Sequence, residues 1–366
     1  MEEKIPWQHF DFLLLGTVAV LTIFGITMIG STISGNIDLA GYAQRQLIFA
    51  VAGFVVMILI ASIDYHFWSA VNRPMYIVTV VLLAVLFIAA KAVFGSARWF
   101  RTALISIQPS EFAKIVIILV LAEFFAQNFS KITDLRTILR SLILTLGVVV
   151  WIILQPNLST SIVILVIWFA LLWASGLKVQ YLALFIAGAL LISVVTFPFL
   201  ADYQKQRVLT FLEADPTARQ GATYNVNQAL ISIGSGGLLG QGYGHGTQVQ
   251  LRFLKVRWSD YIFSAMAEEF GFVGLLIILA LQLFVIYRCL HASRQARDTF
   301  GALICYGVAT LLAFQGLVNI GVNLNLMPAT GLPLPFISYG GSSLVSSLIA
   351  IGLVQSVILR HKALEF

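Results

Sequence analysis

Charged side chains and cysteines are scarce in this sequence. Asp, Glu, Lys and Arg make up 10% of its 366 residues, whereas hydrophobic residues make up 59%. Together with a mean hydropathy of +0.94, this composition excludes an ordinary soluble globular domain. The two cysteines, Cys289 and Cys305, fall near span ends on the expected cytoplasmic side, where thiols stay reduced, so no disulfide is expected. The chain is therefore predicted to be an integral membrane protein.

Apolar runs long enough to cross a bilayer recur along the whole chain. A bilayer core of about 30 Å needs about 20 mostly apolar residues per helix, and helices satisfy every backbone polar group in lipid. The fold class is expected to be all-α, a polytopic membrane protein with about ten transmembrane helices. The spans are expected at roughly 10–30, 44–62, 74–95, 108–126, 140–155, 158–175, 180–199, 261–288, 300–325 and 336–358.

Basic residues in the short loops predict the orientation. The short loops on one side hold Arg45, Arg98 and Arg101, whereas those on the other side hold Lys4, Arg73, Lys131, Arg136, Arg140, Lys178, Arg288, Arg294, Arg297, Arg360 and Lys362. By the positive-inside rule both termini are cytoplasmic. Segment 201–260 is then one large extracytoplasmic loop within a single membrane domain, 1–366.

The expected loop is basic and rich in glycine. A basic surface beside the membrane favours anionic head groups or phosphates, and a solvated loop that interacts generally with acidic lipid explains the charge equally well. Seven glycines lie between Gly234 and Gly246. Their spacing fits neither a dinucleotide fingerprint nor a P-loop, so turn formation is favoured over phosphate binding.

Ionisable residues inside or beside spans are candidate functional residues, because burying a charge in lipid is costly. Pro109 opens a helix on which Glu111 and Lys114 lie three residues apart, close enough to pair. The pair is either a structural ion pair or part of a functional cavity. Asp260 precedes the eighth span, and its spacing alone favours a structural role as a helix N-cap.

Prolines and glycines crowd the connection between the ninth and tenth spans. Pro328, Pro333 and Pro335 forbid a continuous helix there. Irregular backbone at membrane depth is tolerated where protein buries it or where it lines a wet cavity. The segment therefore either walls a site or forms a rigid turn with close helix packing through Gly340 and Gly341.

Four blocks of sequence carry a family resemblance. They are Arg98-Trp99 with Gln108 to Lys114; Gln155 to Thr160; Ser259 to Phe263 with Ala267 to Glu269; and Gly331 to Pro335 with Ser338 to Ser342. In this order they resemble the SEDS family of shape, elongation, division and sporulation proteins, which includes RodA and FtsW. Gly246-Thr247-Gln248 is more similar to RodA. Asn157 and Ser159 depart from the family's usual Asp and Gly.

The resemblance implies an inverting peptidoglycan glycosyltransferase that polymerises lipid II, an undecaprenyl-pyrophosphate-linked disaccharide pentapeptide, outside the cytoplasmic membrane for cell elongation and rod shape. It implies a class B penicillin-binding protein, a transpeptidase, as partner, together with membrane lipid and without nucleic acid. It also implies the bacterial cytoplasmic (inner) membrane as the location. Two alternatives stay open: a lipid II flippase gated by Glu111 and Lys114, and a scaffold for the transpeptidase without catalytic activity.

The resemblance also assigns candidate site residues. It makes Asp260 the expected catalytic base, in preference to the N-cap role. Glu111, Lys114 and Trp99 are expected to shape the substrate cavity. Guanidinium groups match phosphate oxygens, so pyrophosphate binding is expected from Arg98, Arg101 and Arg207. No cofactor is required by the sequence; a divalent cation such as magnesium or manganese is an open alternative, and its ligands are unknown.

Overall fold

The computed structural model describes residues 7–36, 39–92, 99–101, 106–178, 180–199, 202–212 and 221–360. Within these ranges, ten helices coincide with the ten expected spans. They are α1 (Phe12–Ile33), α2 (Tyr42–Ser62), α3 (Tyr65–Ala92), α4 (Pro109–Gln127), α5 (Leu135–Leu154), α6 (Leu158–Ala174), α7 (Gln180–Thr196), α11 (Ile262–Gln295), α12 (Thr299–Asn323) and α13 (Gly341–Leu359). Seven of these described helices, all but α4, α6 and α7, are long and apolar enough to cross a membrane. The protein is a multi-pass, nearly all-helical membrane protein.

Four expected boundaries are wrong by five residues or more. Helix α5 begins at Leu135 rather than near residue 140, and α11 ends at Gln295 rather than near residue 288. Helix α3 begins at Tyr65 rather than near residue 74, and it runs through Pro74. A membrane helix tolerates an interior proline when its surroundings satisfy the freed backbone groups. Helix α13 begins at Gly341 rather than near residue 336, because the preceding segment folds as an irregular loop with Phe336 at a φ of 65°.

The expected large loop is mostly helical. It contains α8 (Asp202–Leu212), α9 (Gly221–Gly236) and the single turn α10 (Thr247–Gln250). Elsewhere the described chain adds the short strands β1 (Phe100–Arg101) and β2 (Ser106–Ile107), and 3-10 turns at Trp7–His9, Phe129–Lys131 and Phe197–Phe199. The sequences of α8 and α9 lack the apolar length that a transmembrane span requires.

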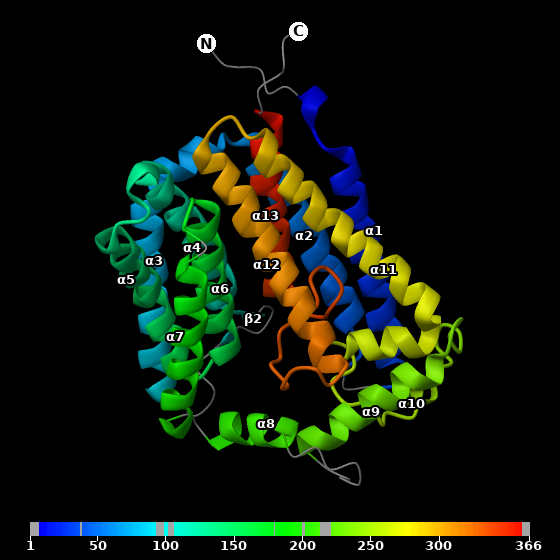
Figure 1. Ribbon diagram of the computed structural model, residues 1–366. Coiled ribbons are helices and arrows are strands. Elements are labelled where there is room, and N and C mark those ends of the chain that lie inside the picture. Colours follow the sequence, from blue (N-terminus) through cyan, green and yellow to red (C-terminus); the bar gives the residue numbers. More distant parts are fainter. Residues whose placement is uncertain are drawn as a thin grey trace.

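The two ends of the bundle differ. Helix α1 begins and α13 ends at one end, whereas α8 and α9 lie across the opposite end (Figure 1). This arrangement agrees with the expected topology, in which both termini share one side and the large loop occupies the other.

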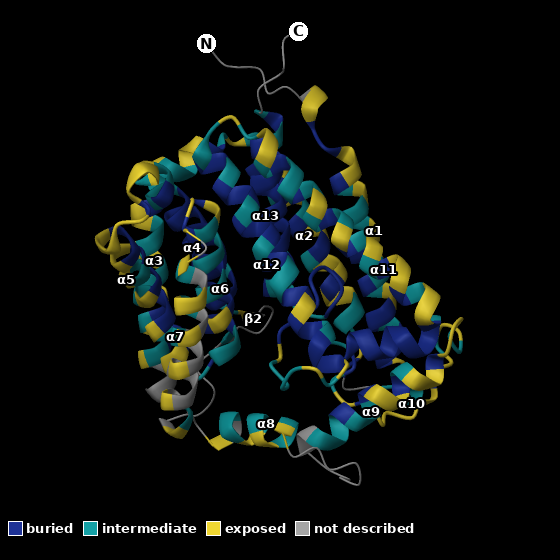
Figure 2. Cartoon of the chain, in the orientation of Figure 1, coloured by how far each residue is buried: buried dark blue, intermediate teal, exposed yellow. Residues whose placement is uncertain are grey.

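Burial separates inner from outer helices. Buried residues make up 78% of the apolar window of α13 and 67% of that of α12, but only 17% of that of α3 (Figure 2). Large apolar side chains such as Phe12, Ile48 and Ile88 are exposed on the outside of the bundle. Lipid replaces protein as their apolar surroundings.

The first helix is tied to the last ones through Asp11. This buried N-cap residue accepts a hydrogen bond from the amide of Leu14 at 2.9 Å. Its carboxylate also pairs with the guanidinium of Arg288 on α11, with 2.6 Å between Nε and Oδ2. The side chain of Gln355 on α13 bonds both backbone polar groups of Asp11. Asp11 thus fastens α1 to α11 through its carboxylate and to α13 through its backbone.

Helix α11 is broken at Gly271, whose φ of 65° and ψ of −169° are not helical. The backbone groups freed by the break bond to the glycine-rich segment. Gln241 and Gly242 donate to the carbonyls of Glu268 and Glu269, both at 2.9 Å, and Phe272 donates to Gly237 at 2.9 Å. A Cβ at Gly240 or at Gly271 would collide with backbone of the other segment. The glycine run therefore forms turns and permits close backbone contact, which confirms the favoured role.

Asp298 holds the α11–α12 connection to α3. It caps α12 by accepting from the amide of Gly301 at 2.7 Å, and its other oxygen accepts from the hydroxyl of Tyr65 at 2.7 Å and contacts Nε2 of His66 at 2.8 Å. Partial burial raises the pKa of Asp298, but these hydrogen bonds more than offset burial and keep the pKa below its ordinary value.

We expect Asp298→Ala to lower the free energy of unfolding by about 1–2 kcal/mol, because the cap and its cross-helix partners are lost. The lowered pKa makes this contribution fully present above the ordinary aspartate pKa and lost as the pH falls through the folded-state value. Thermal unfolding in detergent across pH 3–7 measures it. Asp134→Ala is the control, because Asp134 precedes α5 without a side-chain cap bond; an equal loss in both variants would contradict the assignment.

Candidate functional site

Segment 258–260 is fastened to the loop that precedes α13, at the end of the bundle that carries α8 and α9. The amide of Tyr339 donates to the carbonyl of Trp258 at 2.9 Å. The hydroxyl of Ser338 donates to the carbonyl of Ser259 at 2.8 Å and accepts from the amide of Leu334 at 2.8 Å. The proline-rich segment therefore forms a wall directly beside Asp260, and its role as the wall of a functional site stays a prediction.

Two asparagine amides on α12 hold the backbone of Asp260. Nδ2 of Asn319 and Nδ2 of Asn323 donate to the Asp260 carbonyl at 3.2 Å and 2.9 Å. The Oδ1 atom of Asn323 accepts from both the amide and the hydroxyl of Ser264, in the first turn of α11, at 3.1 Å and 2.6 Å. Asn323 on α12 thus accepts the amide hydrogen bond that an N-cap side chain would otherwise accept at the start of α11.

The N-cap interpretation of Asp260 is wrong. The residue at the N-cap position is Tyr261, and it makes no side-chain cap bond. Because Asn323 already satisfies the amide of Ser264, the carboxylate of Asp260 is free to face away from the helix end.

Asp260 is half-buried, and its carboxyl group has few hydrogen-bond partners. Its Oδ1 accepts from the hydroxyl of Ser259 at 3.0 Å, and a Cβ at Gly331 would lie 3.6 Å from its Oδ2. Burial raises the pKa of Asp260; the hydrogen bond from Ser259 and the positive charge of Arg207 oppose the rise but do not cancel it. A carboxylate with a raised pKa at a protein surface is suited to accept a proton.

Arg207 reaches the site from α8. Its Nη1 donates to the carbonyl of Thr330 at 3.2 Å, and the hydroxyl of Ser159 donates to the same carbonyl at 2.7 Å. The carbonyl of Thr330 therefore joins α8 and α6 to the wall beside Asp260. Ser159, one of the two departures from the family pattern, has a structural role in this contact.

Asn157, the other departure, caps a helix. Its Oδ1 accepts from the amide of Thr160 at 3.3 Å, and its Nδ2 lies 3.5 Å from the hydroxyl of Ser110 on α4. An aspartate could make the same cap bond, so the cap itself does not require a carboxylate.

The Glu111–Lys114 pair is confirmed. Nζ of Lys114 lies 2.8 Å from Oε2 of Glu111, and both side chains are buried. The hydroxyl of Ser346 on α13 lies 3.5 Å from the same oxygen. The start of α4 also contacts the first turn of α13, because the amide of Gln108 donates to the hydroxyl of Ser342 at 3.0 Å. Among the described residues, no hydrogen bond joins the pair directly to Asp260.

The remaining predicted site residues are only partly placed. Trp99 directly precedes β1 and is partly buried. Arg101 lies in β1, but its side chain, like the whole of Arg98, falls outside the described residues. Within the described ranges, no group of three or more His, Cys, Asp or Glu side chains could hold a metal ion. The structure thus brings Asp260 and Arg207 together, and it leaves the roles of the others as predictions.

Asn319, Asn323 and Ser338 were not predicted as functional residues. A signal for the asparagines was present, because two amides four residues apart share one face of an otherwise apolar helix. Polar residues in a span usually face the protein interior. Their partner, a backbone carbonyl 59 or more residues earlier, has no sequence signature.

Comparison with known proteins gives one consistent family. The family model of FtsW, RodA and SpoVE, described as cell cycle protein, matches residues 9–363. The peptidoglycan glycosyltransferase MrdB of Escherichia coli K12 is 34% identical over 99% of this chain and 98% of its own length. A probable peptidoglycan glycosyltransferase FtsW of Geobacter sp. strain M18 is 32% identical over 97% of this chain and 98% of its own.

Solved structures agree with the sequence relatives. A chain of a peptidoglycan synthase complex, studied for the structural coordination of polymerization and crosslinking, superposes with a TM-score of 0.80 at 29% identity, over 95% of this chain and 97% of that chain. The Thermus thermophilus rod shape determining protein RodA superposes with a TM-score of 0.71 at 28% identity, over 96% and 97%.

We expect Lys114→Met to lower the free energy of unfolding by about 3–5 kcal/mol, because it leaves the buried carboxylate of Glu111 without a counter-charge. The double variant Glu111→Leu with Lys114→Met should recover most of that loss, since it removes both charges. Thermal unfolding of the detergent-solubilised chain measures both, with the exposed Lys131→Met as control. If the double variant is as unstable as the single one, the charges are not the cause.

Proposed function

Because the chain belongs to the FtsW, RodA and SpoVE family of cell cycle proteins, we propose that Asp260 is the general base with which it polymerises lipid II. Relatives that match nearly the whole chain are peptidoglycan glycosyltransferases, and the activity of this chain is peptidoglycan glycosyl transfer for cell elongation. The resemblance expected from the four sequence blocks is thereby confirmed. The observation that carries the proposal is the backbone of Asp260 held by two asparagine amides, with its carboxyl group left outside those bonds.

The reaction joins two sugars and breaks the bond between the donor sugar and its pyrophosphate. The 4-hydroxyl of an acceptor sugar attacks the anomeric carbon of the donor, the bond from that carbon to the pyrophosphate oxygen breaks, and undecaprenyl pyrophosphate leaves. Attack from the side opposite the leaving group inverts the anomeric centre. The attacking hydroxyl must lose its proton, and the departing pyrophosphate gains negative charge.

Asp260 and Arg207 suit these two requirements. The raised pKa of Asp260 makes its carboxylate a stronger base than an ordinary aspartate, and Asn319 and Asn323 fix the backbone that carries it. Arg207 lies close enough to interact electrostatically with Asp260, and a guanidinium group offers paired donors to phosphate oxygens. In this proposal Arg207 stabilises the leaving pyrophosphate while Asp260 holds the proton.

A divalent cation stays a prediction. The donor set required for a resident metal is not assembled among the described side chains, so no step of the proposal uses one. A magnesium ion carried by the pyrophosphate itself would belong to the substrate.

The proposed function also implies where the protein is located and which protein it binds. We place both termini in the cytoplasm and the Asp260 site at the outer surface of the bacterial inner membrane, because the basic short loops share the side of the termini. A class B penicillin-binding protein is the proposed partner. It is supported by the similarity to a chain from a complex that coordinates polymerization with crosslinking.

We expect Asp260→Asn to lower the rate of glycan polymerisation by about 100- to 10,000-fold, the usual contribution of a general base. The assay uses the full chain purified with its cognate transpeptidase and labelled lipid II. For the wild type, the rate should fall at acidic pH through a pKa above the usual aspartate value of about 3.9, because the base must be ionised. Polymer from both proteins would refute the assignment of Asp260 as the base. Polymer from neither would contradict the glycosyltransferase activity, and lipid flipping in liposomes would then be measured.

Asn323 is expected to act as a positioning residue. Asn323→Ala removes the bonds to the Asp260 carbonyl and to Ser264, and a base displaced by about 1 Å costs up to about 100-fold in rate. We expect kcat to fall while KM changes little, since no substrate contact is lost. A melting temperature measured on the same sample separates this effect from unfolding, and a folded variant with wild-type kcat would exclude the role.

A further inference from the structure

A cavity of about 680 Å³ lies between α3, α4 and α5. None of the residues that hold Asp260 lines it. Its volume is in the range of small-molecule sites. Its polar wall consists of Ser69, Asn72, Arg73, Tyr76, Glu123 and Gln127. Polar side chains on the membrane-embedded helices of a bundle call for a partner, because lipid tails offer none.

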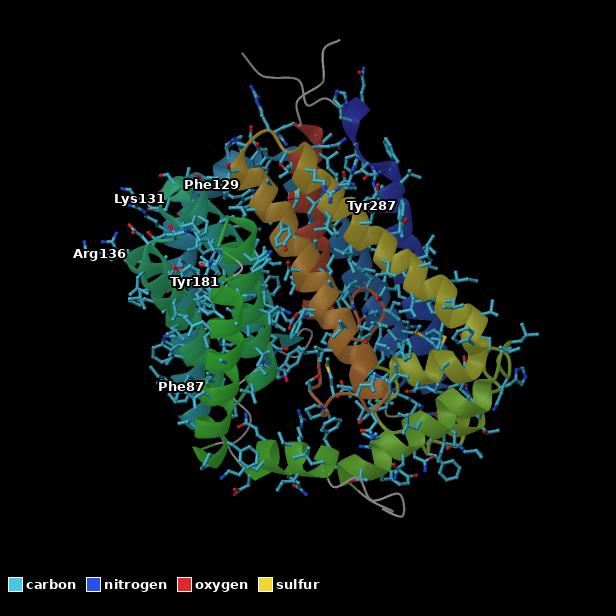
Figure 3. All side chains as sticks on the ribbon, in the orientation of Figure 1. Phe87, Phe129, Lys131, Arg136, Tyr181 and Tyr287 are labelled. Carbon is cyan, nitrogen blue, oxygen red and sulfur yellow. The ribbon has the colours of Figure 1, made fainter. Side chains whose placement is uncertain are left out.

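The cavity lies in the half of the bundle assigned to the cytoplasm. Its polar residues come from the first turns of α3 and the last turns of α4. Lys131 and Arg136 project outward toward this end, whereas Phe87, further along α3, lies toward the other (Figure 3). The cavity is therefore at the depth where inner-leaflet head groups meet the protein, and basic residues at its edge attract their phosphates.

Two opposite charges line this cavity without meeting. Within the described part of the chain, no ion pair joins Arg73 to Glu123. One oxygen of Glu123 accepts from Nε2 of Gln127 at 2.6 Å, which leaves the other oxygen available. The hydroxyl of Tyr76 is already used, because it donates to the carbonyl of Leu144 on α5 at 2.8 Å. Among the described lining residues, the cavity thus presents one cation and one carboxylate that are not paired with each other.

The rest of the wall is apolar. Ala70, Ile77, Val120, Phe124 and Leu144 complete the lining. A ligand that fits carries a negative group, a positive group with N–H donors and an adjoining hydrocarbon part. Phosphate binds guanidinium well, and a primary ammonium donates hydrogen bonds to a carboxylate.

We propose that this cavity binds a zwitterionic phospholipid with a primary ammonium, as in phosphatidylethanolamine, from the inner leaflet. Arg73 binds the phosphate and Glu123 binds the ammonium. Phosphatidylglycerol lacks a cation for Glu123, and the quaternary ammonium of phosphatidylcholine has no N–H donor. This site is independent of the glycosyltransferase site.

Native mass spectrometry of the full chain in detergent tests the site, with the three lipids carrying identical acyl chains. We expect the wild type to bind phosphatidylethanolamine about tenfold more tightly than the other two lipids. Arg73→Gln should weaken the binding of all three. Glu123→Gln should remove the preference for phosphatidylethanolamine and leave phosphatidylglycerol binding unchanged. Arg136→Gln, which removes a nearby exposed charge outside the cavity, is the matched control.

The comparison of the three lipids uses the wild type alone. The proposal can therefore be refuted even if a variant fails to fold. Equal affinity for the three lipids would overturn it. So would an equal loss of affinity in Arg136→Gln, which would indicate general surface charge. Binding of water-soluble phosphoethanolamine without binding of the lipid would also overturn it, since the site would then take a soluble ligand.

Discussion

The end of the bundle that carries α8 and α9 depends on the contact between the carbonyl of Asp260 and the amides of Asn319 and Asn323. The contact joins the start of α11 to the end of α12 and replaces the cap that α11 lacks. Asn319 also donates to the carbonyl of Leu332 at 2.8 Å, so the same helix face positions the wall. The side-chain carboxylate of Asp260 takes no part in this contact, because the neutral amides of Asn319 and Asn323 bond the backbone carbonyl.

Much of the fold could be predicted because lipid imposes simple rules. Apolar length gave the ten spans, and glycine and proline marked the irregular segments. What could not be predicted depends on contacts between distant segments. The break of α11 at Gly271 is satisfied by residues 237–242, which bond its free backbone groups. The start of α3 at Tyr65, nine residues before Pro74, likewise has no signal in the local sequence.

The site was predictable in its residues more than in its geometry. Asp260 and the Glu111–Lys114 pair stood out as charges in apolar surroundings, and the pair could be derived from helix spacing alone. Arg207 was weakly indicated, since its place beside Asp260 depends on how α8 crosses the end of the bundle. For Asn157 and Ser159, the structure supplies roles that sequence could not, as a helix cap and as a contact to Thr330.

The tie between Asp11 and Arg288 has a consequence for biogenesis. The two residues are separated by 277 positions, so the first helix is made long before its counter-charge exists. At about 5–20 residues per second, a ribosome needs on the order of 15–55 s to reach Arg288. During that interval the carboxylate of Asp11 must stay at the membrane surface in water. The contact that fastens the first helix to α11 therefore forms only after most of the chain has been made.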